Sequence, residues 1–178
     1  STESVLTNIF EEAFASSSIP SFEIPSQVTL IEERAFFSCK KIHRIEIAND
    51  SKLQTIGKEA FAKTSISSFK IPSQVIQIEE RAFDSCYKLQ RFDIANDSKL
   101  QTIGKRTLIR SISIPSHVTR IEEYAFDDCQ FLNIIEFGTN YTVGLIVLYS
   151  LRNIKKNTIL MFPVHLNSNS YFNYFHYL

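Results

Sequence analysis

The sequence repeats itself, and this repetition constrains the fold more than any other feature. The block ANDSKLQTIGK at residues 48–58 returns unchanged at 95–105, and IPSQV at 24–28 returns at 71–75. Each long repeat divides into two similar halves of 22–25 residues, which share the pattern aliphatic-x-x-Ile-x-x-x-Ala-Phe. Residues 1–137 hold six such units. A compact α/β domain does not explain near-identical blocks at regular spacing, so we expect a repeat array.

Each unit predicts one short strand and one turn. The unit ends in two apolar residues separated by a polar one, such as Ile45 and Ile47, which is typical of a strand with both apolar side chains on one face. The Glu-Glu-Arg-Ala-Phe stretch at 32–36 predicts one helical turn with its Ala and Phe facing inward. So small a unit cannot bury a core alone, and the units must stack, with their strands in a parallel ladder. The inward phenylalanines would form a spine of Phe14, Phe36, Phe61, Phe83 and Phe126.

The unit that begins at Leu100 departs from this pattern. It has Thr107-Leu108 in place of Ala-Phe, and it lacks four residues between Leu108 and Ile112 compared with 61–69. We expect a local irregularity of the array at this unit.

Residues 138–178 change in character, because no acidic residue follows Glu136 and Asn, Tyr and Phe become frequent. The stretch 143–163 predicts a degenerate seventh unit that caps the array, since terminal units are usually atypical. The aromatic stretch 164–178 has no period and is interpreted as a loose tail, with packing over the cap as the alternative. The absence of any basic residue after Lys156 argues against a membrane-surface role for this aromatic stretch.

The composition excludes several classes of partner. Lys and Arg number 19 and Asp and Glu 19, so there is no basic excess for a nucleic-acid backbone. The longest apolar run, 144–148, is far shorter than the roughly 20 residues that span a bilayer. The chain begins Ser-Thr-Glu-Ser, without the Met, basic flank or apolar stretch of a signal peptide. We therefore expect a mature form or an excised piece.

The string Val-x-x-Ile-x-x-x-Ala-Phe-x-x-Cys-x-x-Leu-x-x-Phe-x-Ile-Ala at 75–95 resembles the treponemal-type leucine-rich repeat of BspA-like surface proteins. The resemblance covers 6–137 and lacks the Asn ladder of ordinary leucine-rich repeats at its usual place. It implies an α/β solenoid: a right-handed leucine-rich-repeat array with a parallel β-ladder on the concave side and short helical turns on the convex side. It also implies a cell-surface or secreted protein that adheres to host proteins or to other cells.

No pattern predicts catalysis, a metal or a cofactor. Cys39, Cys86 and Cys129 recur in alternate units, roughly 10 Å apart, beyond the approximately 7 Å Cα limit of a disulfide. We expect each to fill a small buried slot. The histidines lack metal-ligand spacing, and the paired glutamates, such as Glu32 and Glu33, are interpreted as a solvated rim.

Strand alternation predicts which side chains point outward from the ladder. Arg44 and Arg91 form a basic column beside a mainly acidic one. One hypothesis is that the charges only relieve repulsion, with Lys70 between Glu46 and Asp93; the other is that they bind a partner. The predicted ligand-binding residues are Glu23, Arg44, Glu46, Lys70, Arg91, Asp93, Ser113 and Glu136.

Three Asn-x-Ser/Thr sequons follow predicted strands, at Asn49, Asn96 and Asn140. They are either candidate glycosylation sites or copies of one unit.

The leading functional hypothesis is a non-catalytic protein-binding module, whose partner is a host, neighbouring-cell or matrix protein. We expect no nucleic acid, no small-molecule substrate, and contact with a membrane only through parts absent from this chain. A structural scaffold or spacer without a dedicated ligand is the alternative, and an enzyme regulator is a third, weaker one.

Overall fold

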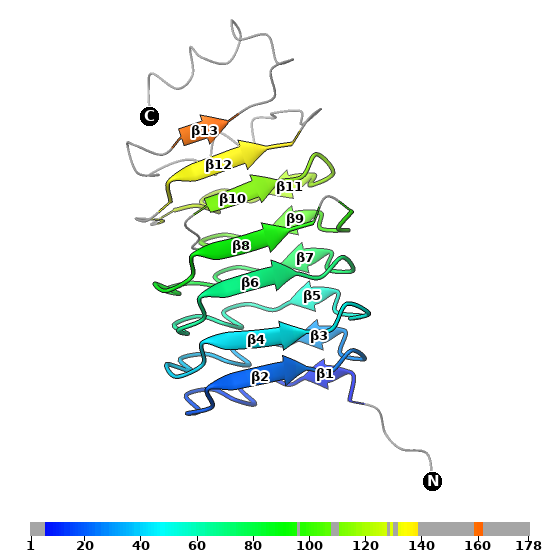
Figure 1. Ribbon diagram of the computed structural model, residues 1–178, viewed down its shortest axis with the longest axis vertical. Helices are drawn as coiled ribbons and strands as arrows, with labels where there is room; N and C mark the ends of the chain where they lie inside the picture. The colour runs from blue at the N-terminus through cyan, green and yellow to red at the C-terminus, as the bar shows by residue number, and fades with distance from the viewer. Residues whose placement is uncertain are drawn as a thin grey trace, which may run out of the picture.

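The computed structural model shows a column of stacked turns (Figure 1). It describes residues 6–95, 97–107, 111–127, 129, 132–138 and 159–161. The repeat units follow one another along the column in chain order, as the colours from blue to yellow show. The chain is therefore a solenoid with a parallel β-ladder, as the repeats predict.

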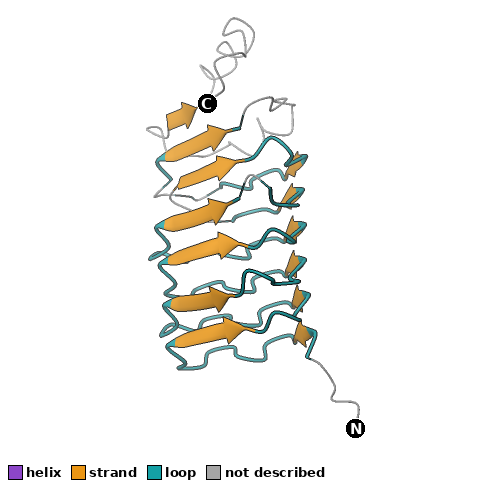
Figure 2. Ribbon diagram, turned by 45° about the vertical axis from the view of Figure 1, so that its right-hand side comes forward, coloured by secondary structure: helices purple, strands orange, loops and turns teal. Residues whose placement is uncertain are grey.

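Each unit contributes two strands of different length. The longer strands, with four residues in all but the last, are β2 (Ser21–Ile24), β4 (Arg44–Ile47), β6 (Ser68–Ile71), β8 (Arg91–Ile94), β10 (Ser111–Ile114), β12 (Ile134–Phe137) and β13 (Ile159–Met161). The two-residue strands are β1 (Asn8–Ile9), β3 (Leu30–Ile31), β5 (Thr55–Ile56), β7 (Gln77–Ile78), β9 (Thr102–Ile103) and β11 (Arg120–Ile121). Figure 2 shows the two sets on separate sides of the column.

The two-residue strands form one continuous ladder that the sequence analysis did not predict. They pair in parallel in the order β1-β3-β5-β7-β9-β11. The second residue of each is an isoleucine that packs into the core, such as Ile31, Ile56 and Ile78, all fully buried. Two residues are too few to show the alternation by which a strand is recognised in a sequence.

The ladder of longer strands was predicted, but it is interrupted at two places. Strands pair as β2-β4, β6-β8 and β10-β12-β13, and no strand pairing joins β4 to β6 or β8 to β10. Where two strands pair, the residue that follows the second strand can donate its N–H to the first. The Gly138 N–H, after β12, donates in this way to the Ile114 carbonyl of β10 at 2.8 Å. Pro72 and Pro115 follow β6 and β10, and a proline has no N–H to offer the preceding strand.

The helical turn predicted at 32–36 is wrong, as are short helical turns in the other units. In the part of the chain that the structure describes, no residue is helical (Figure 2). The Arg34 and Phe36 N–H groups donate to the carbonyls of Lys58 and Ala60 in the next unit, each at 2.8 Å. The Phe37 N–H, next along the chain, instead donates within its own unit, to the carbonyl of Arg34 three residues back, at 2.9 Å. Alternate N–H groups thus hold neighbouring units together, whereas a helix would bond every group within its own unit.

This backbone needs left-handed residues, and none of them is glycine. Among the described residues, positive φ values of 52–61° occur at Glu12, Ser16, Arg34, Ser38, Glu59, Lys63, Arg81, Ser85, Arg106 and Tyr124. The left-handed conformation costs a residue with a Cβ about 1–2 kcal/mol. The bonds between units stabilise it.

The phenylalanine spine is confirmed. Phe14, Phe36, Phe61 and Phe83 stack with ring centroids 5.1, 5.1 and 5.4 Å apart and interplanar angles of 10° or less. Phe126 is also fully buried.

The unit between Phe83 and Phe126 has no spine phenylalanine, and the buried Thr107 lies in the core there. The array also changes register here, because the Arg106 N–H donates to the left-handed Tyr124 at 2.9 Å, whereas the Arg81 N–H donates to Lys105, the residue before a left-handed one, at 2.6 Å. The expected irregularity therefore falls at this unit.

The C-terminal region is described only in part. Strand β13 extends the ladder in parallel beyond β12, with Leu160 opposite Ile135. The rest of the predicted seventh unit at 143–163, and the tail at 164–178, lie outside the described residues. Among the described residues, no helix is long and apolar enough to cross a membrane.

Candidate functional site

The outward side chains of the longer strands form a surface that we call the strand face. On each strand the side chains alternate between core and solvent, as on β6, where Phe69 and Ile71 are buried and Ser68 and Lys70 are exposed. All eight residues predicted to point outward are exposed. The alternation prediction therefore places them correctly, and their role in binding stays a prediction.

The register gathers these eight residues into three groups. Directly opposite one another lie Glu23 and Glu46, Lys70 and Asp93, and Ser113 and Glu136. The interruptions of the ladder separate the groups. The groups are Glu23, Arg44 and Glu46; Lys70, Arg91 and Asp93; and Ser113 and Glu136.

The two arginines bind carboxylates of their own strands. Arg44 Nη2 lies 2.8 Å from Glu46 Oε1, and Arg91 Nη2 lies 3.2 Å from Asp93 Oδ2. The Arg44–Glu46 pair offsets the repulsion between Glu46 and Glu23 across the strands. Lys70 faces Asp93 across the β6-β8 pair, and no strand pairing places it against β4. Such exposed pairs contribute about 0–1 kcal/mol each, so the fold does not depend on them.

The last described strands of the strand face carry an apolar patch that sequence reasoning missed. Ile134, Ile159 and Met161 point outward, with 37%, 57% and 48% of their surface exposed. Ile134 lies opposite Ile159, and Met161 lies opposite Glu136. The signal was present, because Ile134 and Ile135 are consecutive and only one of them can face the core.

The paired glutamates support the backbone of neighbouring units. Glu32 Oε2 accepts the Glu11 N–H and Glu79 Oε2 accepts the Lys58 N–H, each at 3.0 Å. The second glutamate of a pair lies toward solvent, where Glu33 binds Lys58 at 3.3 Å. These positions suit a structural rim rather than acid–base chemistry.

All three cysteines are free and buried, as expected. The Cys39 and Cys86 thiols donate to the carbonyls of Phe14 and Phe61 in the preceding units, at 2.8 and 3.0 Å. Burial raises the pKa of the Cys86 thiol to about 12, which keeps it protonated at neutral pH. Among the described residues, no group of His, Cys, Asp or Glu could hold a metal ion.

Thiol labelling tests this arrangement. Because the thiolate is the reactive form, the thiol of Cys86 should react with a disulfide reagent far more slowly in the native protein at pH 8 than after denaturation. Denaturation without reductant should release three thiols per chain. An intramolecular Cys39–Cys86 bridge would contradict the stacking geometry.

Of the three sequons, the structure describes one asparagine. Asn49 lies exposed in the turn after β4. Asn96 and Asn140 lie outside the described residues, and glycosylation at all three stays a prediction.

The chain matches the family described as BspA type leucine rich repeat region, with six copies, over residues 7–133 and 105–177. A comparison with the curated proteins finds no match. One similar structure is a leucine-rich repeat protein from Bacteroides ovatus, with 24% identity and a TM-score of 0.65 over 75% of this chain and 37% of that one. Another is the pneumococcal vaccine antigen PcpA, with 15% identity and a TM-score of 0.53 over 87% and 56% of the two chains. At these identities the similarity shows a shared fold, and this chain spans about a third to a half of those proteins.

Proposed function

The chain belongs to the BspA-type leucine-rich repeat family, and from this premise we propose that it is a non-catalytic protein-binding module that acts in cell-surface adhesion through its strand face. Repeat arrays present extended surfaces that recognise macromolecules. The proposed partner is a protein of a host or neighbouring cell, or of its matrix. A surface or secreted location is part of the proposal, and the similarity to a protein described as a vaccine antigen is in keeping with it.

The observation that carries the proposal is the make-up of the strand face. Exposed charged groups lie along the β2-β4 and β6-β8 pairs, and an exposed apolar patch of Ile134, Ile159 and Met161 follows at β12 and β13. Protein interfaces combine these two features, an apolar centre and a polar rim. Contiguous exposed apolar residues on a soluble fold mark interaction sites.

A structural spacer is the second candidate. It is favoured by the ion pairs Arg44–Glu46 and Arg91–Asp93, in which the charges of the strand face already bind one another. A spacer has no dedicated ligand, so charge reversal on its strand face would weaken no specific interaction with a partner.

Charge reversal on the strand face separates the two candidates. The immobilised chain is first used to capture proteins from animal-cell and matrix extracts, and a captured protein is purified. Its affinity is then measured for the parent and for the double variant Arg44→Glu/Arg91→Glu. We expect the double variant to keep the parent's melting temperature and to bind at least several-fold more weakly. For the parent, binding should weaken as salt rises, because charged groups at an interface are screened.

The matched control reverses the same number of charges elsewhere. Lys41 and Lys88 occupy equivalent exposed positions in the units that carry Arg44 and Arg91, in the loops before β4 and β8. Lys41→Glu/Lys88→Glu should bind like the parent. Equal binding by Arg44→Glu/Arg91→Glu would place the binding site elsewhere, and the absence of any specific partner would favour the spacer.

A further inference from the structure

The outward side of the two-residue ladder is a second surface, which we call the short-strand face. It consists of the first residue of each of β5, β7 and β9 and the residue before it: Gln54, Thr55, Ile76, Gln77, Gln101 and Thr102. All six are exposed or half-buried, whereas the isoleucine that ends each strand is fully buried. Figure 2 shows these strands on a separate side of the column from the longer strands.

The short-strand face keeps one register throughout, unlike the strand face. Thr55 lies opposite Gln77, which lies opposite Thr102. The Ile76 N–H donates to the Gln54 carbonyl, and the Gln101 N–H donates to the Ile76 carbonyl, each at 2.8 Å. Equivalent side chains therefore follow one another at roughly the 4.8 Å spacing of paired strands. The face presents two rows of side chains that run along the column.

No charged side chain belongs to this face. The three strands and the residues before them contain only glutamine, threonine and isoleucine. Of the residues next to these segments in the chain, Glu79 alone is charged, and its Oε2 accepts the Lys58 N–H at 3.0 Å. Toward β11 the uncharged region ends at Arg120, which lies opposite Thr102 and binds Glu122 at 3.4 Å.

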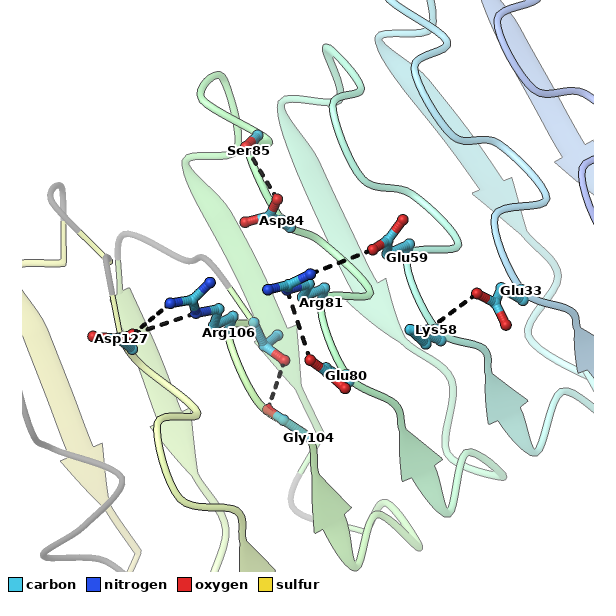
Figure 3. A network of polar contacts seen from close by, with 11 residues as sticks. Glu33, Lys58, Glu59, Glu80, Arg81, Asp84, Ser85, Gly104, Arg106 and Asp127 are labelled. Carbon is cyan, nitrogen blue, oxygen red and sulfur yellow. Dashed lines mark hydrogen bonds and ion pairs between the residues drawn. The ribbon is translucent and has the colours of Figure 1, made fainter.

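Charged side chains lie instead on the neighbouring turns, where they bind one another (Figure 3). Lys58 Nζ lies 3.3 Å from Glu33 Oε1, and Arg81 lies 3.7 Å from both Glu59 and Glu80. The short-strand face itself offers no counter-charge to a charged ligand, so its chemistry favours an uncharged one.

The polar side chains of the short-strand face have no partner within the part of the chain that the structure describes. There, no hydrogen bond involves the side chain of Gln54, Thr55, Gln77, Gln101 or Thr102. Amide and hydroxyl groups both donate and accept hydrogen bonds, as the hydroxyl groups of sugars do. The 38% exposed Ile76 adds an apolar contact between them. The face has no aromatic residue and no arginine, the types that protein interfaces favour.

We propose that the short-strand face binds an uncharged, extended polysaccharide that lies along the column, such as a β-linked glucose chain of the kind found in cellulose. Its hydroxyl groups bond to the amide and hydroxyl groups of the two rows, and the apolar side of a sugar ring contacts Ile76. A linear polymer fits because equivalent contacts recur from unit to unit, so that a longer chain binds more tightly. No residue of this face belongs to the strand face, and the proposal does not rest on protein binding there.

NMR titration of the isotope-labelled full chain with cellohexaose, a soluble cellulose fragment, tests this proposal. We expect saturable shifts of the side-chain amide signals of Gln54, Gln77 and Gln101, with a dissociation constant of roughly 1 mM. Glucose at the same concentration should not saturate these signals, because a single ring cannot contact several units.

Two glutamine variants provide a matched pair. Gln77→Ala removes an exposed amide from the middle of the face and should weaken cellohexaose binding at least threefold, with the parent's melting temperature retained. Gln90 is exposed in the loop immediately before β8 and lies outside the face. Gln90→Ala should therefore bind cellohexaose like the parent.

Three results would overturn the proposal. The first is the absence of saturation with cellohexaose, and the second is an equal loss of binding in both glutamine variants. The third is tighter binding of a charged chain, oligogalacturonate, at the same amide signals. If Gln77→Ala instead weakened binding of the protein captured by the strand-face experiment and left cellohexaose binding unchanged, the face would be a protein site.

Discussion

Replacement of Phe83 by alanine is expected to lower the free energy of unfolding by about 3–5 kcal/mol, the usual effect of such a truncation in a core. Phe83 is fully buried. Its ring stacks on Phe61 at 5.4 Å and meets the edges of Phe69 and Phe92 at 4.9 and 5.1 Å. The alanine variant loses all three contacts in the middle of the array, and each unit is stabilised mainly by its neighbours.

Denaturant unfolding measures this loss, and Phe10→Ala is the matched control. Phe10 is 61% exposed, so its truncation should change the free energy of unfolding by about 1 kcal/mol or less. A Phe83→Ala variant that unfolds like the parent would contradict the stacked spine.

Ile78→Asp should unfold the middle of the array. Ile78 is fully buried in β7 and lies between Ile56 and Ile103 in the two-residue ladder. The variant loses the burial of an isoleucine side chain, about 2–5 kcal/mol. It also buries a carboxyl group without a partner, roughly 2–7 kcal/mol more. The sum approaches or exceeds the stability of a typical domain, about 5–15 kcal/mol.

The adjacent residue of the same strand is the control for Ile78→Asp. Gln77 is exposed, so Gln77→Asp introduces the same carboxylate into solvent and should leave a folded protein. Circular dichroism and thermal melting compare the two. If both variants fold equally well, the two-residue ladder does not bury Ile78.

The core and the outward residues were predictable because they follow from repetition and alternation. The spine phenylalanine lies five residues after the repeated isoleucine in each regular unit. Ile45 and Ile47 must share a face if they lie in one strand. The same argument exposes Arg44 and Glu46 without knowledge of the neighbouring units.

The turn was not predictable, because its local sequence and its tertiary bonds disagree. Glu, Arg and Ala favour helix in isolation, yet Arg34 is left-handed with a φ of 55°. Its N–H bonds to Lys58 in the next unit. This bond exists only once the units have stacked, so no pattern within one unit reveals it.

The candidate sites were predictable to different degrees. Alternation located the charged residues of the strand face, but not their division into groups, which depends on where Pro72 and Pro115 interrupt pairing. The missing residues before Ile112 indicated an irregularity, and Arg106 in the place of Glu59 was visible in the sequence.

In the described regular units, alternate N–H groups of each turn bond to the next unit, so that these turns join the units into one solenoid and are not helical. Scalar couplings across hydrogen bonds, measured by a long-range HNCO experiment on the deuterated, labelled protein, test it directly. The structure predicts a coupling from the Phe36 nitrogen to the Ala60 carbonyl carbon, and from Phe61 to Ala82, since both bonds are 2.8 Å. Couplings of the same two nitrogens to Glu32 and Gly57, four residues back in their own units, would show helical turns and contradict the account.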